Sequence, residues 1–122
     1  MENINILQTE TIELACWLVD KTYGTIKRKL QGGRRSCAVI NKVIDEDEIL
    51  VEIRLYRVTL TCSFNTDDVC ECVYLFFDRS RDVSRYLLYL NQHYLSAGSV
   101  WLINGRSIRL EVQRKELYFT IT

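Results

Sequence analysis

The apolar and polar residues of this chain alternate with a period of two over several stretches, which is the pattern of half-buried β-strands. The first clear case surrounds an acidic turn at residues 45–48. A hairpin closed by this turn brings three apolar pairs onto one face: Ile44 with Ile49, Ile40 with Ile53, and Ala38 with Leu55. The sequence therefore predicts two antiparallel strands here, with one face in the core.

The alternation changes phase next to Leu55. Apolar residues occupy odd positions over residues 49–55 and even positions over residues 56–64. Because a strand keeps each parity on one face, we expect a β-bulge or a strand break at residues 55–57. A turn at residues 65–68 then predicts a second hairpin, with these pairs: Phe64 and Val69, Cys62 and Glu71, Leu60 and Val73, Val58 and Leu75, Tyr56 and Phe77.

The last third of the chain predicts a three-stranded meander. Asn104-Gly105 is a strong hairpin signal, because both residues tolerate the positive φ of a tight turn. It pairs Trp101 with Ile108, and a second turn at residues 113–116 follows. Eight apolar residues then share the face expected to enter the core: Trp101, Ile103, Ile108, Leu110, Val112, Leu117, Phe119 and Ile121.

Two segments, residues 9–22 and 80–95, have the period of amphipathic helices. Gly32-Gly33 is a hairpin signal, but residues 27–30 are good helix formers, so residues 22–30 stay open between strand and helix. The order of elements predicts a single α+β domain over residues 1–122. In it, two helices cover one side of a mainly antiparallel sheet of about six to eight strands.

Composition and charge narrow the class of protein. The 122 residues carry 16 basic and 16 acidic side chains, so the net charge gives no general attraction to nucleic acid or to a membrane surface. An apolar content of 48% argues against intrinsic disorder across the chain, and no apolar run is long enough to span a bilayer. Five cysteines without a secretory leader pattern indicate a reduced, cytoplasmic protein.

Candidate chemistry is sparse. Cys70 and Cys72 lie two residues apart in a predicted strand, but a zinc site needs about four ligands, and the predicted register puts Cys62 on the opposite face. The only histidine, His93, comes late in its predicted helix, where it is expected to face solvent. Phosphate-loop, nucleophile-elbow, zinc-protease and dinucleotide motifs are absent. We therefore expect no metal, no cofactor and no catalytic residue, and an enzyme is the less favoured interpretation.

Three aromatic residues fall outside the predicted core faces: Tyr74, Phe76 and Tyr89. If they are exposed together, they form a surface that binds another protein. The alternative is that the first helix covers them.

The densest positive charge consists of Lys27, Arg28, Lys29, Arg34 and Arg35. On a hairpin, these side chains could contact the phosphates of a nucleic acid. The alternative is a solvated hairpin, partly balanced by the acidic turn at residues 45–48.

From Tyr86 the chain reads YLLYLNQHYLSAGSVWLINGRSIRLEV. A helix ending in Leu-x-x-Leu-Asn, a short join and two strands around a tight turn resemble the second half of the type III secretion chaperone and YbjN-like α+β families. Those families usually end in a third helix, whereas residues 117–122 are predicted as a strand, and the chaperones tend to be acidic. The resemblance implies a small, often dimeric, non-catalytic module that binds another protein.

The leading hypothesis is a non-enzymatic protein-binding module of the chaperone, immunity, antitoxin or inhibitor type. Its partner is another protein of unknown identity, and a homodimer is one option. One alternative is a nucleic-acid-binding module that uses the basic hairpin between Lys27 and Arg35. A second alternative is a small-molecule enzyme or carrier with a pocket between the sheet and the helices.

Overall fold

The computed structural model of the chain describes residues 2–32, 39–45 and 48–122, with side chains over residues 6–31 and 49–122. Along the chain its elements are α1 (Glu2–Leu18), α2 (Tyr23–Gly32), β1 (Val39–Asp45), β2 (Glu48–Arg54), β3 (Val58–Phe64), β4 (Cys70–Phe77), α3 (Arg81–His93), β5 (Ser96–Ala97), β6 (Val100–Ile103), β7 (Arg106–Gln113) and β8 (Glu116–Ile121). The described strands form one antiparallel sheet in the order β1-β2-β3-β4-β8-β7-β6-β5. The predicted α+β class is confirmed.

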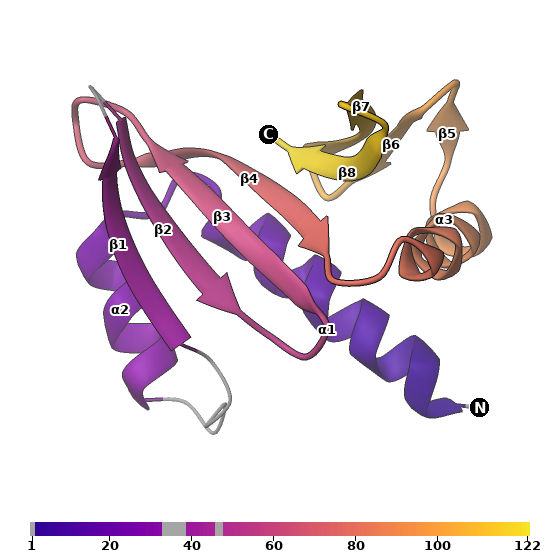
Figure 1. Cartoon of the computed structure of the whole chain (residues 1–122), viewed down its shortest axis with the longest axis horizontal. Helices are drawn as coiled ribbons and strands as arrows, with labels where there is room; N and C mark the ends of the chain where they lie inside the picture. The colour runs from indigo at the N-terminus through magenta and orange to yellow at the C-terminus, as the bar shows by residue number, and fades with distance from the viewer. Residues whose placement is uncertain (1, 33–38, 46–47) are drawn as a thin grey trace.

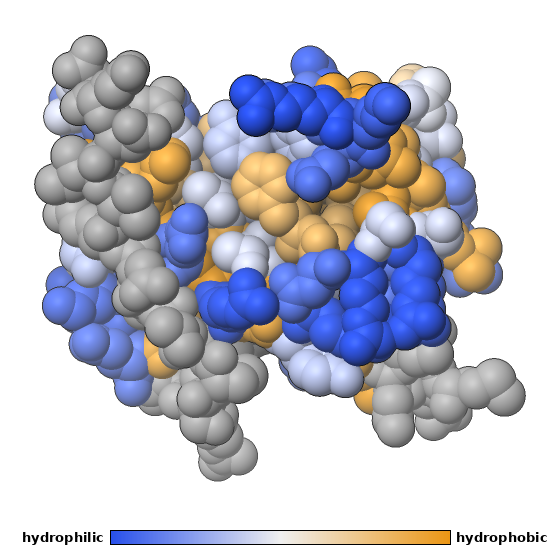
Figure 2. Space-filling model, viewed as in Figure 1, coloured by the Kyte–Doolittle hydropathy of each residue, from blue (hydrophilic) through white to orange (hydrophobic). Residues whose placement is uncertain are grey.

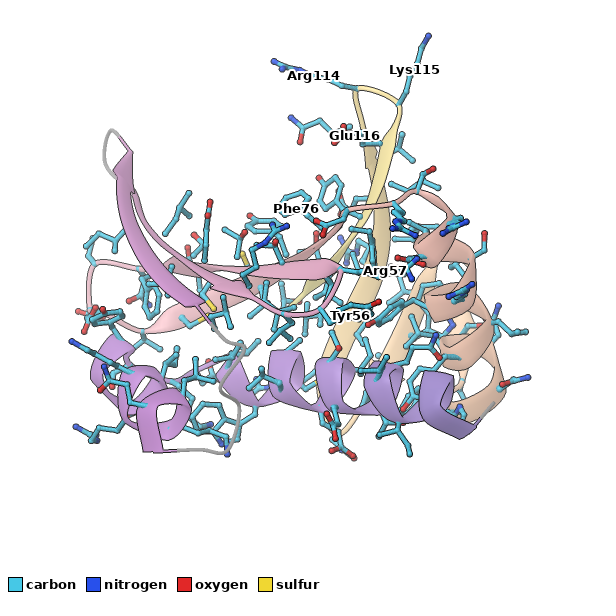
Figure 3. All side chains as sticks on the ribbon, turned by 60° about the horizontal axis from the view of Figure 1, so that its bottom comes forward. Tyr56, Arg57, Phe76, Arg114, Lys115 and Glu116 are labelled. Atoms are coloured by element: carbon cyan, nitrogen blue, oxygen red, sulfur yellow. The ribbon has the colours of Figure 1, made fainter. Side chains whose placement is uncertain are left out.

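The helices lie on one side of the sheet. Figure 3 shows α1 and α2 beneath the strands, with α3 beside the end of α1. Along β2, β3, β4 and β8, buried side chains that face the helices alternate with more exposed ones, and they form a single core layer between sheet and helices. Its largest fully buried members are Phe119, Ile12, Leu18, Ile26, Ile53, Leu60, Leu75, Leu90, Ile108 and Ile121. The other face of the sheet carries no described helix (Figure 1).

Residues 23–32 form helix α2, so the choice left open between strand and helix is decided for the helix, and Thr22 forms an isolated bridge with Val69. Lys27, Lys29 and their neighbours favour helix locally, and helical spacing puts Ile26 and Leu30 on one buried stripe. The described chain therefore has a third helix, α2, beyond the two that were predicted. The second half of the Gly32-Gly33 hairpin signal, residues 33–38, lies outside the described residues.

The two predicted hairpins on the N-terminal side of the sheet differ in outcome. In the first, Ile44 pairs with Ile49 and Ile40 with Ile53, as predicted, while Ala38 lies outside the described residues. The strand break at residues 55–57 is also confirmed. There the Leu55 amide donates to the Val58 carbonyl over 2.9 Å, and the turn folds β3 back onto β2.

The predicted register of β3 with β4 is wrong by two residues. Leu60 pairs with Leu75 and Cys62 with Val73, because the loop is longer than predicted and the register then shifts after Ser63. The side-chain oxygen of Asn65 accepts hydrogen bonds from the amides of Asp67 and Val69, which closes this longer loop. The shift moves Cys70 opposite Phe64, onto the core face.

The predicted C-terminal meander is confirmed in its pairing, since Trp101 pairs with Ile108 and Leu110 with Phe119. Its predicted core face is too long, however: Val112 is 66% exposed and Leu117 41% exposed. The reason is that β4 pairs with β8 only between residues 73–75 and 119–121, so the far end of the β7 and β8 hairpin has no strand beside it. Figure 3 shows this hairpin standing above the open face.

The two turns of the meander differ in backbone strain. Asn104 and Gly105 have φ of 47° and 79°, which these residue types tolerate, while Arg114 and Lys115 have φ of 52° and 67°, which they rarely adopt. Each left-handed residue with a long side chain costs roughly 1 kcal/mol. The turn at the tip of the β7 and β8 hairpin is therefore strained.

We expect the double change Arg114→Asn with Lys115→Gly to raise the free energy of unfolding by about 1 kcal/mol, because the strain relieved at two residues exceeds the entropic cost of the added glycine. Urea unfolding measures the effect. The reciprocal control, Asn104→Arg with Gly105→Lys, should lower the free energy of unfolding by a similar amount. No atom lies near the position of a side chain at Gly105, so the cost there would come from the backbone alone. An unchanged or reduced stability of the first variant would contradict the strained turn.

Candidate functional site

The open face of the sheet holds a groove of about 630 Å³. Its floor consists of the outward-facing positions of β2, β3 and β4, and the β7 and β8 hairpin supplies one wall. Figure 2 looks onto this face, where apolar and weakly polar side chains gather at the centre between strongly polar ones. The lining residues are Leu50, Glu52, Arg54, Thr59, Thr61, Tyr74, Phe76, Gln113 and Tyr118.

Three aromatic rings meet in this groove. Tyr74 and Phe76 lie two residues apart on β4, which puts them on the same face, and Tyr118 comes from the neighbouring β8. The ring centroids are 6.2 Å apart for Tyr74 and Phe76, 5.3 Å for Phe76 and Tyr118, and 6.3 Å for Tyr74 and Tyr118. These separations are those of interacting rings, so the three side chains, called here the aromatic cluster, form one continuous apolar surface. Phe76 is 39% exposed at its centre.

The polar lining of the groove is close to electrically neutral. Its charged residues, Glu52 and Arg54, have opposite signs, and Arg54 is already engaged. The Arg54 guanidinium donates to the Asp78 carboxylate over 3.1 Å and to the Thr59 hydroxyl over 3.2 Å. Thr59 and Thr61 add short hydroxyl side chains to the floor. The groove is therefore suited to an apolar side chain flanked by hydrogen-bonding groups and not to a strongly charged ligand.

Two of the three aromatic residues that the sequence predicted for a binding surface lie in this groove. Tyr74 and Phe76 line the groove, on the face away from α1, which excludes the alternative that the first helix covers them (Figure 3). Tyr89 is not on this surface: it is 3% exposed on α3 and packs against His93 and Tyr94. Tyr118 completes the cluster and was missed. The predicted register already put Phe119 in the core, so the parity of β8 could have placed Tyr118 on the outer face.

The described residues of the basic cluster lie on a helix and not on a hairpin strand. Lys27, Arg28 and Lys29 lie on α2, whereas Arg34 and Arg35 lie outside the described residues. Two of the helix residues have contacts within the molecule: the Lys29 ammonium lies 4.5 Å from the centre of the Trp17 ring, and Arg28 donates to the Thr25 hydroxyl over 3.3 Å. Figure 3 shows α2 on the opposite side of the sheet from Phe76, so these cations and the aromatic cluster do not share a surface.

The register shift brings Cys62 and Cys70 together in the core, where each is fully buried. The Cys70 thiol donates to the Cys72 carbonyl over 3.4 Å. The hydrogen bond with Cys70, together with burial, raises the pKa of the Cys62 thiol, and the same bond lowers the pKa of Cys70. Burial also raises the pKa of Cys16 to about 11. Cys16 and Cys62 are therefore protonated at neutral pH. Cys70 is fully buried, so its thiol is out of reach of a substrate despite its lowered pKa.

His93 lies at the C-terminal end of α3 and faces solvent, as predicted. Its Nδ1 is 2.9 Å from the carbonyl oxygen of Tyr89, a distance at which the ring N–H donates a hydrogen bond.

Over the described residues, no three His, Cys, Asp or Glu side chains cluster in a way that could hold a metal ion. None of the described helices combines the length and apolar character needed to cross a bilayer.

Comparison with known proteins identifies no relative: no family model, no curated protein and no solved structure matches this chain. The resemblance to secretion chaperones and YbjN-like proteins accordingly stays a prediction from the sequence.

Proposed function

We propose that this chain is a non-enzymatic module that binds another protein on the open face of its sheet. The observation that carries the proposal is the aromatic cluster of Tyr74, Phe76 and Tyr118 on the side that no described helix covers. A sheet face at which large apolar side chains remain in contact with solvent is typical of a surface that a partner covers.

The chemistry of the groove defines the partner segment. Aromatic side chains around a hollow accept one large apolar anchor, and such anchors supply most of the binding energy in protein interfaces. The opposite charges of Glu52 and Arg54 favour a segment with little net charge. The partner proposed here is therefore a protein with an exposed aromatic or branched apolar residue between uncharged polar neighbours.

Nucleic acid fits this surface less well. Single strands that stack on aromatic rings also need cations along the backbone. The cations of α2 lie on the opposite side of the sheet, and Arg54 is paired with Asp78. Binding to the groove should therefore depend little on salt, whereas phosphate contacts would weaken steeply as salt rises.

We expect Phe76→Asp to abolish partner binding without unfolding the protein, because Phe76 is at the centre of the exposed cluster. A photoreactive phenylalanine analogue at position 118 would be cross-linked in the source cells, and the adduct identified by mass spectrometry. The cross-linked segment, made as a peptide, should bind the native chain at least about tenfold more tightly than the Phe76→Asp variant, as for an interface hot spot.

The matched control is Leu88→Asp, an equally drastic change at a more exposed leucine on α3. This variant should keep both the adduct and the peptide affinity, and thermal unfolding should show that both variants are folded. An adduct that persists in Phe76→Asp, or disappears equally in Leu88→Asp, would contradict the proposed surface. A nucleic-acid adduct whose yield falls when the cross-linking is repeated in lysates of rising salt concentration would favour the alternative function.

A further inference from the structure

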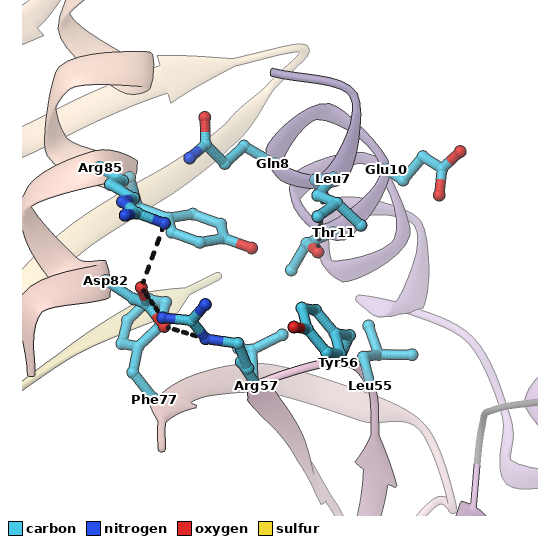
Figure 4. Close-up of a pocket in the computed structure, with 12 residues that line it drawn as sticks. Leu7, Gln8, Glu10, Thr11, Leu55, Tyr56, Arg57, Phe77, Asp82 and Arg85 are labelled. Carbon is cyan, nitrogen blue, oxygen red and sulfur yellow. Dashed lines mark hydrogen bonds and ion pairs between the residues drawn. The ribbon is translucent and has the colours of Figure 1, made fainter. Parts of the chain in front are cut away.

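A second hollow, of about 140 Å³, lies on the helix side of the molecule. It forms where α1, the turn between β2 and β3, and the first two turns of α3 meet (Figure 4). The pocket and the groove have no lining residue in common. The two sites are therefore distinct, and the role of the pocket is independent of the proposed function.

The polar end of this pocket has an excess of positive charge. The Arg57 guanidinium donates through Nε and Nη2 to the two oxygens of Asp82, over 3.0 and 2.8 Å. Arg85 is 3.8 Å from the same carboxylate, too far for a hydrogen bond. Two guanidinium groups thus surround one carboxylate. Glu10 also lines the pocket, but its carboxylate points away from Arg57 in Figure 4.

Arg57 is held in a way that keeps donors available. Its φ of 65° is a conformation that side chains rarely adopt, and the turn directs the side chain toward α3. Asp82 occupies two of its five donors, and the Nη1 group makes no hydrogen bond to any described residue. Arg57 is only partly exposed and Asp82 is buried, so the remaining donors lie in a partly desolvated site, where an anion is bound more strongly than at the surface.

The remainder of the wall is apolar. Leu7, Leu55, Val58 and Phe77 line it together with the ring of Tyr86. Burial raises the pKa of the Tyr86 phenol, so this hydroxyl stays neutral and adds no negative charge at physiological pH. An apolar chamber with a few polar groups at one end is the usual form of a small-molecule site.

Gln8 supplies a further polar group to the pocket. Its side chain is 4% exposed and lines the pocket, yet its carboxamide forms no hydrogen bond within the part of the chain that the structure describes. Among the described residues, every completely enclosed side-chain nitrogen or oxygen has a partner, so the Gln8 amide opens into the pocket. Figure 4 shows this amide directed toward the α3 side, beside Arg85. The amide is therefore available to a ligand.

We infer that this pocket binds a small carboxylic acid with a compact aromatic or branched apolar body. The carboxylate would accept hydrogen bonds from Arg57, Arg85 and Gln8, and the body would fill the space between Leu7 and Phe77. The volume sets the size, since a cavity of about 150 Å³ accommodates benzene. The excess of one positive charge at the polar end selects an anion over a neutral or cationic ligand of equal size.

Benzoate and 3-methylbutanoate are suitable probes, and benzamide is the neutral isostere of the first. Titrations of the isotopically labelled chain followed by NMR should show saturable shifts of the Thr11, Tyr56 and Tyr86 amides. A ligand of this size is expected to have a Kd on the order of 1 mM for benzoate. Benzamide should bind more than about tenfold more weakly, because it lacks all the charge-assisted hydrogen bonds.

Arg85→Gln should weaken benzoate binding about tenfold and leave benzamide binding unchanged, since it removes one charge-assisted contact. The matched control is Arg81→Gln, which makes the same charge change at an exposed position on α3 outside the pocket. A second variant, Leu7→Trp, should block both probes by filling the space, at a position exposed enough to tolerate it. Shifts that do not saturate, equal binding of benzoate and benzamide, or equal losses in the two arginine variants would overturn the inference.

Discussion

Replacing Phe119 with alanine is expected to lower the free energy of unfolding by about 4 kcal/mol, the largest effect of any single truncation considered. Phe119 is fully buried on β8 and packs edge to face against Phe77 and Trp101, with centroids 5.8 and 6.1 Å away. It thus joins the C-terminal strands to β4 where the sheet is held by only three residue pairs. A loss of that size is a large share of the stability of a typical domain.

Urea unfolding of the variant measures this loss. The matched control is Leu117→Ala, two residues earlier on the same face of β8, where the side chain projects past β4 and is partly exposed. It should cost less than about 1 kcal/mol, because little apolar area is lost there. Equal costs at the two positions would show that the core extends along the whole hairpin.

The second large effect is expected from Arg57→Met, which should cost about 3 kcal/mol. The change removes both hydrogen bonds to Asp82 and leaves a buried carboxylate without its closest cation. Arg85, at 3.8 Å, compensates only in part. Chemical denaturation at neutral pH, with far-ultraviolet circular dichroism as the signal, measures the difference.

Removing both charges separates the cost of an unpaired carboxylate from the contribution of the ion pair. Arg57→Met combined with Asp82→Leu should recover most of the stability, because apolar groups of similar size often replace a buried ion pair at little cost. A double variant as unstable as Arg57→Met alone would mean that the turn geometry at Arg57, and not the charge on Asp82, dominates.

The alternation of apolar residues predicted the hairpins but not the exact pairing of β3 with β4. The parity change at Leu55 and the Asn104-Gly105 turn each specify a local event, and both are confirmed. The register of β3 with β4 depended instead on the side chain of Asn65, which closes the loop through the amides of Asp67 and Val69. A two-residue error keeps the same face, so the alternation of apolar residues could not reveal it.

The residues of the candidate site were also predicted only where the alternation within one strand determines them. Parity placed Tyr74 and Phe76 on the outer face, but it could not show that β8 would lie beside β4 and bring Tyr118 next to them. The prediction that Tyr89 lies outside the core was wrong. Its helix has two adjacent stripes of apolar residues, and the packing of α3 against its neighbours decides which stripe is buried. The second pocket combines three elements that are far apart in the sequence, so no local motif could have indicated it.

The place of β8 in the sheet has a consequence for how the protein is made. This strand comes last among the described elements, yet it lies between β4 and β7 and connects the two halves of the sheet. While a ribosome is still translating the meander, β4 has an unpaired edge, and at about 5–20 residues per second that interval lasts a few seconds. Exposed strand edges pair readily with other chains. Overproduction should therefore be limited by aggregation of nascent chains, and slower translation at low temperature should improve the soluble yield.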